Sequence, residues 1–184
     1  LVEGLSSKEV CVQLNRDLPL PLEVDVQQTD ATNGQIGIRW NRPNPIDLDT
    51  LLNLPPYRYE LQRANSLNGT YSTIYTATAA TFAQAKDTFY VDKNLNTSAQ
   101  QYFYKIVFYV NNENTPLGTS PTASSILLSI KPTDKANVLS WTEKTPWTNE
   151  KYAIFRKNDI TNLFDSIGVT TQSPYRDESL VNGK

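Results

Sequence analysis

The stretch QYFYKIVFYV, residues 101–110, decides the fold class of this chain. Its alternate positions Tyr102, Tyr104, Ile106 and Phe108 fall on one face of an extended strand, as they do where a sheet buries one face. Aromatic and β-branched residues also favour strands. The stretch therefore predicts a strand whose aromatic face enters the core of an antiparallel sheet.

Four further strands are predicted upstream, each a short run that alternates apolar and polar residues. They are GQIGIRW (34–40), YRYELQR (57–63), TYSTIYT (70–76) and DTFYVD (87–92). The predicted core between two sheets consists of Trp40, Tyr59, Leu61, Ile74, Tyr104 and Ile106. Asn33 and Gly34 predict a tight turn with positive φ. A long loop with four prolines, expected to be polar, joins the first two strands, and no helix is expected.

An internal repeat relates the two halves of the chain. The matched landmarks are Trp40 with Trp141, 101 residues apart; Tyr59, Leu61, Arg63 and Ile74 with Tyr152, Ile154, Arg156 and Ile167, 93 apart; and Tyr90, Asp92 and Leu95 with Tyr175, Asp177 and Leu180, 85 apart. Length differences fall between the landmarks, where loops tolerate them. One departure is Asn137, which falls where Ile36 lies in the first copy. Either the second copy tolerates a polar residue there, or its strand is shifted by one.

At these residues the chain resembles the fibronectin type III repeat, a seven-stranded sandwich of about 90 to 100 residues. In that family a Trp closes the second strand, and a Leu precedes a Tyr that hydrogen-bonds back to the turn; Leu95 and Tyr102 fit this corner. An immunoglobulin-like sandwich without its disulfide would show many of the same signals. The expected fold is all-β, with tandem antiparallel β-sandwiches and incomplete terminal repeats. Residues 1–18 would be the last strand of a preceding repeat, 19–126 a complete domain, and 127–184 the first five strands of another.

The composition of the chain argues against several classes of function. The 184 residues carry 17 Lys and Arg against 19 Asp and Glu, with no basic block that could neutralise phosphates, so nucleic acid is not an expected partner. No run of apolar residues is long enough to span a membrane. The chain has no His, which removes the commonest general base and metal ligand. No catalytic residue, metal site or cofactor is therefore expected.

The remaining chemical candidates each have a plainer alternative. Cys11 could act as a nucleophile only beside a base, and otherwise reads as a strand thiol or half of a disulfide. Asp47, Asp49 and Asp92 could pair as glycosidase carboxylates, but all three lie near predicted turns, where Asp is favoured for backbone reasons. A solvated loop is the expected setting for each of the three.

Two stretches, EVCVQLNRDLP (9–19) and LSWTEKTPWTNEKYAIFRK (139–157), are similar in sequence to surface proteins of gliding bacteria that use type IX secretion. That resemblance implies an extracellular or cell-surface protein exported across the bacterial outer membrane. It also implies O-glycosylation at Asp followed by Ser or Thr and then an apolar residue, a pattern met at Thr50, Thr88 and Ser166. It further implies that Cys11 pairs with a cysteine upstream of this sequence.

The leading hypothesis is a non-catalytic spacer and adhesive protein-interaction module that binds protein or glycan weakly through its loops. Its partners would be other domains of the same long chain, the outer-membrane secretion machinery, or cell-surface protein or glycan. Protein outside this sequence is expected to cover the open face of the second repeat. The alternative is an accessory glycan-binding module of a polysaccharide-degrading enzyme, with Trp147 or Tyr57 stacked on sugar rings. For Trp147 the favoured interpretation is a loop residue folded over the second sandwich, because large aromatics seldom stay exposed.

Overall fold

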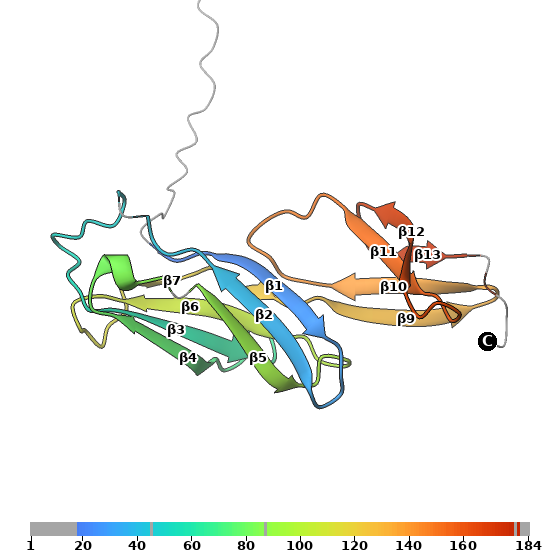
Figure 1. The fold of residues 1–184 in the computed structure, drawn as a ribbon, viewed down its shortest axis with the longest axis horizontal. Helices are drawn as coiled ribbons and strands as arrows, with labels where there is room; N and C mark the ends of the chain where they lie inside the picture. Colours follow the sequence, from blue (N-terminus) through green and yellow to red (C-terminus); the bar gives the residue numbers. More distant parts are fainter. Residues whose placement is uncertain (1–17, 45, 87, 179, 181–184) are drawn as a thin grey trace, which may run out of the picture.

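The computed structural model describes residues 18–44, 46–86, 88–178 and 180, and almost all of its regular structure is antiparallel β-strand (Figure 1). One sheet of the first half has the order β1-β2-β5, and the other has the order β4-β3-β6-β7, with β8 also paired to β6. The strands are β1 (Pro21–Gln28), β2 (Gly34–Trp40), β3 (Tyr57–Ala64), β4 (Ser72–Ala79), β5 (Phe89–Leu95), β6 (Phe103–Tyr109), β7 (Gly118–Thr119) and β8 (Ala123–Ser124). The expectation of an all-β fold with antiparallel sheets is confirmed.

The second half contains two smaller sheets. The strands are β9 (Leu127–Thr133), β10 (Ala136–Thr142), β11 (Tyr152–Lys157), β12 (Phe164–Thr170) and β13 (Tyr175–Asp177). Three of them form a sheet of order β13-β10-β9, and β11 pairs with β12. These strands follow the order of β1 to β5 in the first half. The one helical element in the described residues is a single 3₁₀ turn, Phe82–Gln84, which follows β4.

The core of the first half joins the inward faces of its two sheets. Trp40, Tyr59, Leu61, Tyr104 and Ile106 are all buried there, as predicted. Ile74 is only half-buried at the margin of this core. Opposite it, the pairing of β3 with β4 contains a bulge between Leu61 and Gln62. A bulge changes which residues face inward, so the alternation read from the sequence does not hold along the whole of β4, and Ala77 and Ala79 are buried instead.

Gly34 is needed for a different reason from the one predicted. Neither Asn33 nor Gly34 has a φ in the left-handed region. A Cβ on Gly34 would lie 2.2 Å from Thr97 Oγ1 and 2.7 Å from the Leu95 carbonyl oxygen, closer than side-chain atoms pack. Glycine is therefore required because β2 and the end of β5 approach each other closely.

The second half keeps the strand register of the first. Ile36 faces Asp92 in the pairing of β2 with β5, and Asn137 faces Asp177 in the pairing of β10 with β13. A shift by one residue would have moved Asn137 to the other face. The second half therefore tolerates a polar residue at this place, and its strand is not displaced.

Candidate functional site

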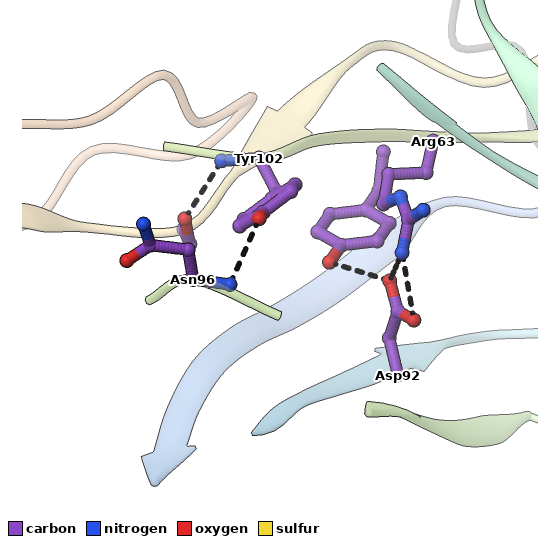
Figure 2. Close-up of polar contacts among 6 residues, drawn as sticks. Arg63, Asp92, Asn96 and Tyr102 are labelled. Atoms are coloured by element: carbon purple, nitrogen blue, oxygen red, sulfur yellow. Dashed lines mark hydrogen bonds and ion pairs between the residues drawn. The ribbon is translucent and has the colours of Figure 1, made fainter. Parts of the chain in front are cut away.

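An ion pair between a half-buried arginine and a buried carboxylate joins the two sheets of the first half (Figure 2). Arg63 Nη1 on β3 donates to both carboxylate oxygens of Asp92 on β5, at 3.0 and 2.9 Å, and Tyr104 Oη on β6 donates to Asp92 Oδ2 at 3.0 Å. Asp92 is 5% exposed. Burial, and then the negative charge of Asp92, raise the pKa of the Tyr104 hydroxyl. The expectation that Asp92 lies in a solvated loop is wrong, because this carboxylate sits between the sheets and holds three strands together.

The predicted tyrosine corner is present. The Asn96 backbone N–H donates to Tyr102 Oη at 3.1 Å, and the Tyr102 backbone N–H donates to Ser125 Oγ at 3.1 Å (Figure 2). Leu95, just before the turn, is buried. The first bond fixes the turn after β5 to the residue that precedes β6, and the second fixes that residue to the segment that follows β8.

The ion pair recurs in the second half at the spacing of the repeat. Arg156 Nη1 on β11 donates to Asp177 Oδ1 and Oδ2 on β13, at 2.9 and 3.1 Å. Asp177 is buried, but the Arg156 side chain is 47% exposed, against 30% for Arg63. Within the described residues no tyrosine hydroxyl donates to Asp177. The acceptor position that the Tyr104 hydroxyl fills on Asp92 is therefore open on Asp177.

The other carboxylate candidates serve the backbone or remain exposed. Asp49 Oδ1 accepts the backbone N–H groups of Leu51 and Leu52, at 2.9 and 3.3 Å. Asp47 is exposed in the same loop. Asp92 is committed to its ion pair, so the three carboxylates do not form a shared site. No group of three or more potential metal ligands is found among the described residues, and Cys11 lies outside them.

Of the two aromatic candidates, Tyr57 is inside the core. Its ring lies edge-on to Phe82 at 5.6 Å and is stacked with Phe108 at 6.0 Å, and its hydroxyl donates to the Asn53 carbonyl oxygen. The expectation that Tyr57 offers an exposed ring to sugars is wrong, because its strand face turns inward. Trp147 is half-buried, and its Nε1 donates to Asn149 Oδ1 at 3.1 Å.

The three candidate glycosylation residues differ in accessibility. Thr50 is exposed in the loop between β2 and β3, and Ser166 is exposed on β12. Thr88 is half-buried, and its carbonyl oxygen accepts the Trp40 backbone N–H at 2.9 Å. Modification at these residues stays a prediction, with Thr50 and Ser166 the more accessible positions.

The loop between β2 and β3, residues 41–56, lies at one end of the first half (Figure 1). Several of its apolar side chains are exposed to solvent. The strongly exposed residues are Ile46, Leu51, Leu52 and Leu54, of which Ile46 and Leu51 are 89% and 85% exposed. The side chains of Pro43 and Leu48 in the same loop are fully buried and anchor it to the protein. The expectation of a polar loop missed this patch, although its aliphatic residues are visible in the sequence IDLDTLLNLP, residues 46–55.

The second half contains an apolar groove between its two sheets. It has a volume of about 450 Å³, and its lining includes Leu139, Trp141, Ile154 and Ile167. The Trp141 ring contacts the Tyr152 ring at 4.9 Å. Leu128, Ile130 and Phe155, which also line the groove, are about half exposed. The groove is therefore a second apolar surface, separate from the loop.

Comparison with known proteins assigns no family to this chain. No family model matches it, and no curated protein is significantly similar to it in sequence. No helix in the described residues is both long and apolar enough to cross a membrane.

Proposed function

We propose that the chain is a non-catalytic, fibronectin type III-like repeat module of a large secreted or cell-surface protein, which acts as a spacer and an adhesive protein-interaction domain. The strand order supports this type of sandwich. The fourth strand, β4, pairs with the third, β3, whereas in a constant-type immunoglobulin domain the fourth strand joins the sheet of the first, second and fifth. The Tyr102 corner and the repeated Arg–Asp pair further support a family of tandem sandwiches.

The exposed apolar loop is the observation that carries the adhesive role. Side chains such as Ile46 and Leu51 cost solvation free energy in water and gain it on contact with a partner. Their loop stands on a packed sandwich and is shaped by turns at Asn44, which accepts the Ile46 N–H, and at Asp49. A loop presented by a rigid scaffold is the usual form of a binding site on such domains.

An array of cell-surface proteins and glycans tests this role. We expect the 184-residue chain to bind a protein component, and the double variant Leu51→Ser, Leu52→Ser to lose that binding. Leu67→Ser is the matched control, because Leu67 is an exposed leucine in the turn between β3 and β4. Equal binding by all three proteins would contradict the proposal.

The glycan-binding alternative rests on Trp147, because this residue is half-buried and not fully covered. Binding to a glycan that is lost with Trp147→Ala and retained by the loop variant would favour that function. Export to the cell surface has its own test, the intact mass of protein from its native host. Added glycan mass is the expected result, and mass analysis of peptides should place it at Thr50 or Ser166.

A further inference from the structure

The groove of the second half lies along a free strand edge. In the first half β3 has neighbours on both sides, since it pairs with β4 and with β6. Its counterpart β11 pairs with β12, and the described residues place no strand on its other side. Free strand edges take up an additional strand through their unpaired N–H and C=O groups.

The first half shows what fits at such an edge. On β3, Tyr59 faces Phe108, Leu61 faces Ile106 and Arg63 faces Tyr104. The residues of β11 at the repeat spacing are Tyr152, Ile154 and Arg156. An added strand in the same register would therefore present an aromatic residue to Tyr152, an aliphatic residue to Ile154 and a tyrosine to Arg156.

The polar end of the groove selects that tyrosine. Asp92 accepts two hydrogen bonds from Arg63 and a third from the Tyr104 hydroxyl, whereas Asp177 accepts two from Arg156. The open acceptor position on Asp177 carries negative charge, so it favours a hydroxyl donor and disfavours an acidic side chain. Hydrogen-bond complementarity thus favours a donor at this end of the strand, and the residue at the matching place in the first half, Tyr104, is such a donor.

The apolar part of the groove specifies the rest. Leu139 and Trp141 on β10 and Ile154 on β11 face a volume of about 450 Å³, within the range of about 300 to 1,000 Å³ of ligand sites. Alternate side chains of an added strand would enter this volume, because successive residues point to opposite faces. Two large apolar residues spaced by two positions would therefore pack against the apolar lining of the groove.

We propose that this groove binds an extended polypeptide segment of the pattern Tyr-x-aliphatic-x-aromatic as a β-strand antiparallel to β11. The tyrosine hydroxyl donates to Asp177, and the two apolar residues pack on Ile154, Trp141 and Tyr152. The occupant is another stretch of protein with this chemistry, and it adds to the sheet in the place that β6 takes in the first half. The inference does not depend on the apolar loop, because the two surfaces share no residue.

The test uses a fluorescent peptide of residues 101–111 with three lysines at each end, titrated into the 184-residue chain and followed by anisotropy. We expect saturable binding that a scrambled peptide with the same lysines does not show. The peptide with Tyr104→Phe should bind about 10- to 100-fold more weakly, which is the effect of one hydrogen bond to a charged acceptor. This substitution leaves the protein itself unchanged.

A protein variant then locates the hydroxyl. In Asp177→Asn the ratio between the tyrosine and phenylalanine peptides should shrink to a few-fold, because a neutral amide is a weaker acceptor. Asp159→Asn removes the same charge from an exposed loop position of the same half and should keep the full ratio. Equal binding of the tyrosine, phenylalanine and scrambled peptides, or no binding, would overturn the proposal. A dimer seen in sedimentation that excludes the peptide would overturn it in favour of a second copy as the occupant.

Discussion

Replacing Asp92 by Ala should destabilise the first half far more than the equivalent Asp177→Ala destabilises the second. Both changes remove a carboxylate that accepts two hydrogen bonds from an arginine. They differ in what remains, because Asp92→Ala also leaves the fully buried Tyr104 hydroxyl without its acceptor. The matched pair therefore isolates the effect of burial and of the tyrosine.

The magnitude follows from the contacts. A hydrogen bond to a charged group contributes about 1.5 to 3 kcal/mol, and a buried hydroxyl left unsatisfied costs about 1 to 3 kcal/mol. We expect Asp92→Ala to lose about 3 to 5 kcal/mol, as for other broken buried ion pairs. Arg156 is 47% exposed and regains water, so Asp177→Ala should lose about 1 kcal/mol or less.

Hydrogen exchange with mass spectrometry measures both halves in one sample. The opening free energy of β2 and β5 should fall in Asp92→Ala, and that of β10 and β13 should change little in Asp177→Ala. Asp25→Ala, an exposed carboxylate on β1, serves as the control and should stay within about 0.5 kcal/mol of the original chain. Equal losses in the two halves would refute the reasoning.

Three further predictions concern the core. Trp40→Ala should cost about 3 to 5 kcal/mol in urea denaturation, because a fully buried indole leaves a cavity, and an unshifted midpoint would count against its place in the core. Tyr59→Phe should raise stability by about 1 kcal/mol, since the Tyr59 hydroxyl is buried without a hydrogen-bond partner in the described structure, and a loss measured in the same assay would contradict this. Burial raises the pKa of Tyr59 and Tyr104 above the unfolded value of about 10. Above pH 10 the unfolded chain therefore loses protons that the folded chain keeps, and each tyrosine lowers the free energy of unfolding by about 1.4 kcal/mol per pH unit, whereas below pH 10 neither has this effect. Urea midpoints measured from pH 9 to 11 should fall, and they should fall less steeply in Tyr104→Phe.

The sequence predicted the strands and most of the core because alternation reports directly which face of a strand is buried. It failed at Ile74, where a bulge changes the inward face, since no residue type marks this bulge. It failed also at Gly34, whose role depends on the approach of Thr97 from the turn after β5. These features depend on tertiary contacts, and a local pattern does not contain them.

The ion pair and the loop could have been found. Arg63 and Asp92 both recur at the repeat spacing, as Arg156 and Asp177, and two opposite charges that recur together on the third and fifth strands indicate a pair. A preference of Asp for turns outweighed this signal in the prediction. The exposure of the apolar loop was missed because its four prolines indicate an irregular segment but do not determine whether its leucines are exposed.

The two halves also allow the effect of an added strand to be measured through Asp177. An occupied groove would cover Arg156 and supply a tyrosine hydroxyl to Asp177, so the second half would acquire the contacts that make Asp92 important in the first. We therefore expect the cost of Asp177→Ala, measured by exchange in β10 and β13, to rise from about 1 kcal/mol toward about 3 kcal/mol when the 101–111 peptide is saturating. With the Tyr104→Phe peptide the cost should rise less, because that strand excludes water but donates no hydrogen bond. A cost that is the same with the empty and the occupied groove would mean that the bound strand does not reach Asp177, and the register inferred from β3 and β6 would be wrong.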